Sequence, residues 1–139
     1  MSTFLVADDD PAIRNMFARS LAALGEVDQA DGGRQALTLL AGQRYDALLL
    51  DLHMPGVDGF AILEELAKEG NVNRETPVFV VTGDTSEQAR LRALKLRSLL
   101  ILTKPVPLAM IRSLIESAVK KSAAKTPPPP APRVPRKAT

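Results

Sequence analysis

The stretch FLVADDDP, from Phe4 to Pro11, decides the fold, because it passes from an apolar strand through an acidic turn into the start of a helix. Its apolar beginning is typical of a buried strand. Asp10 followed by Pro11 is typical of a helix N-cap and the first helical residue. Asp8 and Asp9 lie between the two elements, where neighbouring carboxylates repel each other. The stretch therefore predicts a strand–helix unit with two acids at its turn. The fold alone does not require these two acids.

The same change from apolar strand to helix recurs along the chain. We expect strands at residues 4–7, 26–30, 47–50, 78–81 and 99–102. We expect helices at residues 11–24, 33–43, 60–68, 86–96 and 108–121, each with an apolar face. Residues 47–50 are continuously apolar, as in a central strand covered on both faces, whereas residues 26–30 are less apolar and fit an edge. The alternation predicts an α/β fold with a five-stranded, doubly wound parallel sheet and helices on both faces.

Length and composition indicate one domain followed by a tail. The chain has 139 residues, of which 45% are hydrophobic, and this supports a single core within residues 1–121. Residues 122–139 are basic, rich in Pro and Ala, and poor in large apolar side chains, so we expect a disordered, polyproline-II-like tail. Such a tail is either a solvated terminus or linker, or a ligand for an aromatic-lined groove of a partner.

Charge and composition exclude several classes of function. The formal net charge is +2, but six basic and no acidic residues follow Glu116, which leaves residues 1–119 with 12 basic and 16 acidic side chains. We therefore expect no nucleic-acid binding through the folded body. The absence of cysteine excludes disulfides and thiolate metal sites. No signal-peptide pattern and no apolar run of roughly 20 residues is present, so we expect a cytoplasmic protein without membrane association.

Polar residues collect at the C-terminal ends of the expected strands: Asp8, Asp9, Asp51, Thr82 and Lys104. In an open parallel sheet this edge is where ligands bind, so residues distant in sequence should converge there. Three converging carboxylates are costly unless a cation neutralises them. Ligands that are oxygen atoms only favour a hard divalent ion such as Mg²⁺.

These residue types together describe a pocket for a phosphoryl group. Asp51 ends the central strand and is the best-placed carboxylate nucleophile. Lys104 and a metal ion would stabilise phosphoryl oxygens, and the hydroxyl of Thr82 would donate a hydrogen bond to one of them. The chemistry inferred is the formation and hydrolysis of an aspartyl phosphate.

Four motifs in this order, FLVADD, LLLDLHMPGVDG, VVTG and LTKP, resemble the receiver domain of two-component response regulators, including the chemotaxis-type single-domain regulators. The resemblance covers about residues 3–121 and implies a flavodoxin-like strand order of 2-1-3-4-5. It implies that Asp51 is the phospho-acceptor, that Asp9 binds Mg²⁺ directly, and that Asp8 acts through a metal-bound water. His53 would contribute its backbone carbonyl to the metal.

The remaining family positions match in part. Thr82 and Lys104 stand at the hydroxyl and lysine positions of the family, and the resemblance implies a cis peptide bond between Lys104 and Pro105. Ile101 stands where the family commonly has an aromatic residue that rotates inward as the hydroxyl moves toward the phosphoryl group. Ile101 is shorter than an aromatic residue and is restricted about χ1. We therefore expect Ile101, as the switch position, to weaken coupling to the face formed by residues 86–96, 99–102 and 108–121.

The sequence thus predicts a single-domain response regulator that accepts a phosphoryl group from a histidine kinase or phosphotransfer protein and switches its contacts with a downstream protein. Such a protein is a signalling phospho-acceptor with intrinsic self-phosphorylation and autodephosphorylation chemistry, and not an enzyme with a separate substrate. A receiver-like scaffold that docks partners independently of phosphorylation is the main alternative.

Two other classes fit less well. A flavin- or nucleotide-binding protein needs a phosphate-receiving loop after the first strand, where this chain is acidic. A haloacid-dehalogenase-like phosphatase would carry a second Asp two residues after its nucleophile, where this chain has His53.

Overall fold

The computed structural model describes residues 2–83, 86–96 and 100–125. Its strands are β1 Ser2–Ala7, β2 Gly25–Ala30, β3 Ala47–Leu50, β4 Val78–Thr82 and β5 Leu100–Thr103. Its helices are α1 Pro11–Leu21, α2 Gly33–Gly42, α3 Gly59–Leu66, α4 Glu87–Lys95 and α5 Leu108–Lys125. All strands are parallel, in the order β2-β1-β3-β4-β5. The predicted fold class and the predicted edge position of the second strand are therefore confirmed.

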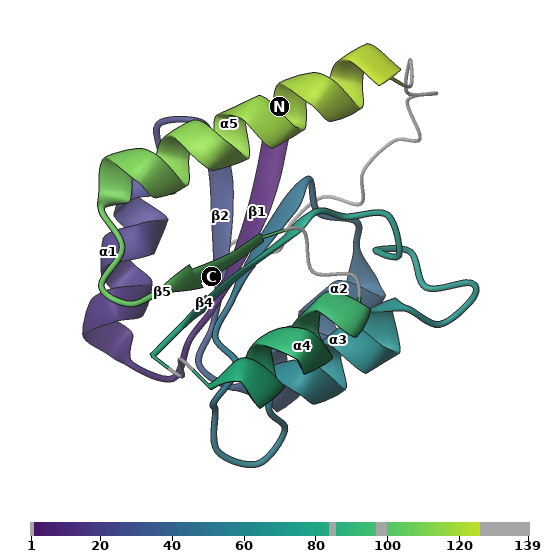
Figure 1. Cartoon of the computed structure of the whole chain (residues 1–139). Helices are drawn as coiled ribbons and strands as arrows, with labels where there is room; N and C mark the ends of the chain where they lie inside the picture. Colours follow the sequence, from purple (N-terminus) through teal and green to yellow (C-terminus); the bar gives the residue numbers. More distant parts are fainter. Residues whose placement is uncertain (1, 84–85, 97–99, 126–139) are drawn as a thin grey trace.

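Side chains alternate across the sheet, so each inner strand contributes to two cores. In β1, Phe4 and Val6 pack into the cluster that includes side chains of α1 and α5, whereas Leu5 and Ala7 pack into the cluster that includes side chains of α2, α3 and α4. Figure 1 shows the same division, with α1 and α5 on one side of the sheet and the other helices opposite. Because both faces are covered, the inner strands are apolar nearly throughout.

Most boundaries differ from the expected ones by one to four residues. The first helix, α1, ends at Leu21 and not at residue 24, because residues 22–24 form the turn into β2. Two of the other differences also have local reasons. β1 begins at Ser2 because this residue already pairs in parallel register with Gly25. α5 ends at Lys125, four residues beyond the expected end at residue 121. Alanine favours the helix in this added turn, and Pro127 is the first residue in the sequence that cannot continue it.

Two further sequence expectations are confirmed, and one lies mostly outside the described residues. The side chain of Asp10 accepts hydrogen bonds from the backbone N–H groups of Ala12 and Ile13, which confirms its role as the N-cap of α1. The peptide bond between Lys104 and Pro105 is cis. Residues 126–139, which make up most of the expected tail, lie outside the described residues. Among the helices that are described, none combines the length and apolar character needed to span a bilayer.

A buried asparagine fixes the end of the sheet opposite to the acidic strand ends. Asn73 is fully buried, and its amide nitrogen donates to the backbone carbonyls of Leu40 and Gln43 at 2.7 and 2.8 Å. Its amide oxygen accepts from the backbone N–H of Tyr45 at 2.7 Å and from the hydroxyl of Thr76 at 2.9 Å. The side chain thereby uses both donors and both acceptors. It ties the loop before β4 to the end of α2 and the start of β3.

Replacing this side chain should be costly. Asn73→Ala removes four hydrogen bonds and leaves buried backbone groups without partners, so we expect the free energy of unfolding to fall by about 3 kcal/mol. Urea denaturation measures this loss, with the exposed Asn15→Ala as the control that should change stability by less than about 0.5 kcal/mol. Equal stability of the two variants would contradict the assignment.

Candidate functional site

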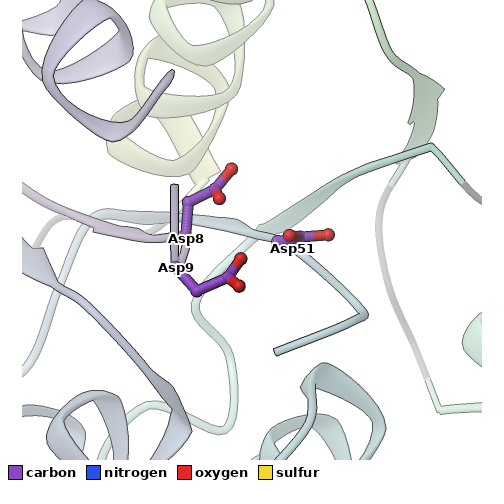
Figure 2. A group of neighbouring side chains, drawn as sticks. All are labelled: Asp8, Asp9 and Asp51. Carbon is purple, nitrogen blue, oxygen red and sulfur yellow. The ribbon is translucent and has the colours of Figure 1, made fainter. Parts of the chain in front are cut away.

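The parallel sheet brings three aspartates together at one edge. Asp8 and Asp9 follow β1, and Asp51 follows β3, the neighbouring strand in the sheet. Each residue offers a carboxylate oxygen, and the three oxygens lie within 4.8 Å of one another. Asp8 and Asp51 are buried, whereas Asp9 is exposed. Figure 2 shows the three side chains next to each other at the strand ends, as the sequence predicts.

Backbone hydrogen bonds hold the two buried acids in line with their strands. The N–H of Asp8 donates to the carbonyl of Ala30 at the end of β2, at 3.1 Å. The N–H of Asp51 donates to the carbonyl of Ala7 at the end of β1, at 3.0 Å. Each acid therefore continues the hydrogen-bonding ladder by one residue, and its position depends on the register of the sheet.

A glycine allows α3 to begin against the same strand end. A β-carbon at Gly59 would lie 2.5 Å from the backbone oxygen of Asp51 and 2.7 Å from the α-carbon of Leu52. The N–H of Gly59 donates to the carbonyl of Leu52 at 2.8 Å. Any larger residue would push the helix away from the loop that carries Asp51.

Lys104 bridges two of the acids from the loop after β5. Its Nζ lies 3.1 Å from Oδ2 of Asp8 and 3.4 Å from Oδ2 of Asp51. Its backbone N–H donates to the carbonyl of Thr82 at 2.8 Å, which joins the loop to the end of β4. One ammonium group thus faces three carboxylates, so the pocket keeps an excess of negative charge that suits a divalent cation.

The pKa shifts follow from this arrangement. Burial raises the pKa of Asp51, and the nearby charge of Asp8 raises it further. The ammonium of Lys104 and the backbone N–H of His53, 3.3 Å from Oδ1, oppose this rise without cancelling it. Burial alone would lower the pKa of Lys104, but its hydrogen bond to Asp8 and the charge of Asp51 outweigh burial, so that pKa is raised.

The three consecutive aspartates have different surroundings. Oδ1 of Asp8 accepts from the backbone N–H of Asp10 at 2.9 Å, and Oδ2 accepts from Lys104. Asp9 is exposed at the edge of the pocket, and Asp10 caps α1. Asp9 is therefore the acid of this run that is best placed for direct contact with an incoming cation.

The structure places the other predicted positions on β4, on β5 and on the loop after β3. Thr82 is buried at the end of β4, where it pairs in register with Thr103. Ile101 is half-buried in β5, pairs with Val80, and packs against the core cluster on the side of α2, α3 and α4. His53 is exposed on the loop that follows Asp51.

Sequence reasoning missed an aromatic contact beside the pocket. The ring of His53 meets the ring of Phe60 edge to face, with centroids 6.3 Å apart. The guanidinium carbon of Arg92 in α4 lies 4.2 Å from the centroid of the Phe60 ring. These residues belong to three different elements, and no periodic pattern in the sequence relates them.

Comparisons with known proteins agree with this geometry. A family model described as the response regulator receiver domain matches residues 4–116. Response regulator MprA of Mycolicibacterium vanbaalenii is 34% identical over 119 residues, which cover 85% of this chain and 50% of that protein.

Two solved structures share the fold. The receiver domain of the Francisella response regulator 1452 is 29% identical, with a TM-score of 0.79 over 88% of this chain and 99% of that one. A Burkholderia pseudomallei response regulator with a phosphorylated aspartic acid, a calcium ion and citrate is 25% identical, with a TM-score of 0.75 over 90% of this chain and 72% of that one.

The curated relatives include sensor proteins as well as response regulators. This chain spans between 9% and 54% of the length of the relatives it matches. The similarity therefore concerns one domain of larger proteins in these cases.

The raised pKa of Asp51 predicts that its charge destabilises the metal-free protein at neutral pH. Because the folded pKa lies above the unfolded value of 3.8, stability is lost as the pH rises through the folded pKa. In the presence of a chelator, Asp51→Asn should therefore melt at a higher temperature than the wild type at pH of about 7, and the difference should shrink below pH of about 4. The exposed Asp31→Asn serves as the control. A difference that does not depend on pH would contradict this account.

Proposed function

This chain belongs to the family of response regulator receiver domains, and we propose that it acts as a single-domain response regulator that accepts a phosphoryl group on Asp51. Receiver domains are phospho-acceptor signalling domains of two-component systems. The observation that supports this role is the meeting of three carboxylates within 4.8 Å beside an ammonium group. The phosphoryl group would come from a histidine kinase or a phosphotransfer protein, and the output would be altered contact with a downstream protein in the cytoplasm.

Magnesium fits the donor set of the pocket. Its preferred ligands are oxygen atoms, and the described residues around the pocket offer carboxylates in excess over ammonium groups. Asp9 and Asp51 would hold the ion directly, Asp8 through a water molecule, and His53 through its backbone carbonyl. When bound, the ion supplies positive charge to the phosphoryl oxygens. The B. pseudomallei relative, described with a phosphorylated aspartic acid and a calcium ion, supports the proposal that this chain takes an aspartyl phosphate and a divalent cation.

Residues of this chain provide the rest of the chemistry. A carboxylate oxygen of Asp51 forms the new O–P bond while the bond from phosphorus to the donor's leaving atom breaks, and the leaving group departs with the bonding electrons. Lys104 already lies 3.4 Å from Oδ2 of Asp51, so its ammonium is close to the arriving phosphoryl oxygens. The hydroxyl of Thr82 would donate to one of these oxygens. In the proposed autodephosphorylation, water forms a new O–P bond while the bond from phosphorus to the carboxylate oxygen of Asp51 breaks, which releases inorganic phosphate and returns the carboxylate.

A phosphorylation-independent scaffold is the second candidate, and one surface favours it. Leu91 and Leu94 of α4 are 51% and 47% exposed, and they lie three residues apart on the helix. Ile101, in place of an aromatic residue, gives the neighbouring β5 a short side chain at the switch position. A partner that binds this apolar face would not require a change at Asp51.

The tail is proposed as a separate element. Its Pro-rich part is a candidate ligand for an aromatic-lined groove of a partner. The receiver domain is proposed to occupy residues 1–121, with the last turn of α5 continuing to Lys125. Neither the tail role nor this boundary affects the chemistry at Asp51.

Labelling by a small phosphodonor tests the proposed function. Acetyl phosphate should label the wild type in the presence of Mg²⁺ and fail to label Asp51→Asn. The reason is that the substitution replaces the nucleophilic carboxylate by a neutral amide group. Phosphate incorporation is measured by intact mass. Asp10→Asn is the matched control, since it removes a neighbouring charge but keeps the helix cap. Labelling of Asp51→Asn at the wild-type level, or no labelling of the wild type, would overturn the proposal.

Ile101 stands where the family commonly has an aromatic residue, and this predicts weak coupling to the face formed by α4, β5 and α5, which we call the output face. On addition of fluoroberyllate and Mg²⁺, backbone amide shifts should change strongly around Thr82 and little in α4, β5 and α5. The reason is that Ile101 is β-branched and has no ring to move between two positions. Amide NMR spectra measure the shifts, and Ile101→Tyr should enlarge those of the output face. Shifts in α4 and α5 as large as those around Thr82 in the wild type would contradict the prediction.

A further inference from the structure

Arg14 contacts the backbone of the acidic pocket from the first helix. It is the fourth residue of α1 and is half-buried. Its Nη1 donates to the backbone carbonyl of Asp8 at 3.0 Å, and its Nε donates to Oε1 of Gln29 in β2 at 3.0 Å. One guanidinium group therefore connects the start of α1, the turn that carries the acids, and the edge strand.

The position of this cation is unfavourable for the helix itself. The N-terminal end of a helix carries partial positive charge and favours acids, whereas cations are favoured at the C-terminal end. The first turn of α1 contains no acidic residue. The helix macrodipole thus disfavours an arginine at this place, whereas its contacts outside the helix favour it.

Each polar group of Asp8 has a hydrogen-bond partner, and Arg14 supplies the last of these partners. The N–H of Asp8 donates to Ala30, Oδ1 accepts from Asp10, and Oδ2 accepts from Lys104. The bond from Arg14 to the carbonyl oxygen is the remaining one, and it fixes the peptide plane that joins Asp8 to Asp9. Asp9 is exposed, so its direction depends on this plane more than on packing.

We propose that Arg14 is a positioning residue for the cation site: it holds the Asp8–Asp9 peptide against β2 so that both carboxylates face the pocket. This inference rests on the proposed function, because it assigns Arg14 to the Mg²⁺-binding step. The planar guanidinium reaches two acceptors at once, which a lysine cannot do in the same geometry. The bond to Asp8 is partly buried and the bond to Gln29 is exposed, so the first contributes more.

The test is Mg²⁺ binding by the full unphosphorylated chain. The dissociation constant is obtained by titrating Mg²⁺ and following the backbone amide shifts of Asp9 and Asp10. Loss of a residue that supports metal ligands weakens metal binding on the order of tenfold or more. We therefore expect Arg14→Met to raise the dissociation constant about tenfold, Arg14→Lys to raise it less, and Gln29→Leu to raise it least.

Arg19→Met is the matched control, because Arg19 is an exposed arginine of the same helix. It removes the same charge and should leave the dissociation constant within about twofold of the wild type, since a distant exposed charge is screened. Urea denaturation of every variant separates positioning from folding. Equal weakening by Arg19→Met would overturn the proposal in favour of net charge. A loss of stability in Arg14→Met and Arg14→Lys without weaker Mg²⁺ binding would overturn it in favour of a structural role.

Failure of the proposed function has a different signature. A wild-type chain that does not bind Mg²⁺ would remove the proposed function and this inference together. If the wild type binds Mg²⁺ and the folded Arg14→Met variant binds it equally tightly, only the proposed role of Arg14 is overturned.

Discussion

The parallel register of β1 and β3 is the constraint on which the acidic pocket depends, because it holds Asp8, Asp9 and Asp51 together against their mutual repulsion. Two like charges about 4 Å apart near a protein surface repel by roughly 4 kcal/mol, and the sheet register holds these acids within 4.8 Å. Lys104 offsets part of this cost through its contacts at 3.1 and 3.4 Å, but burial still raises the pKa of Asp51. The fold therefore maintains an incompletely neutralised charge at a fixed place, and binding a cation or a phosphoryl group there changes the energy of the whole edge.

The opposite end of the sheet supplies the stability that this edge lacks. Asn73 makes four hydrogen bonds and uses every donor and acceptor of its side chain. The inner strands β1, β3 and β4, which run between the two ends, are buried on both faces. The hydrogen bonds of Asn73 are therefore satisfied at one end of the sheet. At the other end, in the loops after the strands, the negative charge is incompletely neutralised. This division is what a domain needs if phosphorylation is to move loops without unfolding the sheet.

The sequence predicts the backbone better than it predicts the contacts between side chains. Apolar segments alternating with helical ones are enough for the doubly wound sheet, and the Asp10–Pro11 pair locates the start of α1 because capping is a local interaction. Convergence of the acids follows from the parallel topology. The roles of Asn73 and Arg14 do not follow, since a loop asparagine or a helix arginine looks the same in sequence whether or not a distant carbonyl lies within reach. The expected end of α5 at residue 121 falls four residues short of Lys125. Helix propensity and the first proline decide where this helix ends, and the change to a basic, Pro-rich composition does not.

Under the proposed function, charge chemistry and signal output would depend on different parts of this chain. The acids, Lys104 and Thr82 lie at strand ends, where topology alone brings them together. Output requires a side chain that has two packed arrangements, and Ile101, half-buried in β5, is a poor candidate because its branched Cβ restricts rotation. The aromatic contact beside the pocket is instead that of His53 with Phe60, which Arg92 of α4 covers at 4.2 Å. A complete pocket therefore does not imply a complete switch, and the two properties have to be established by separate measurements.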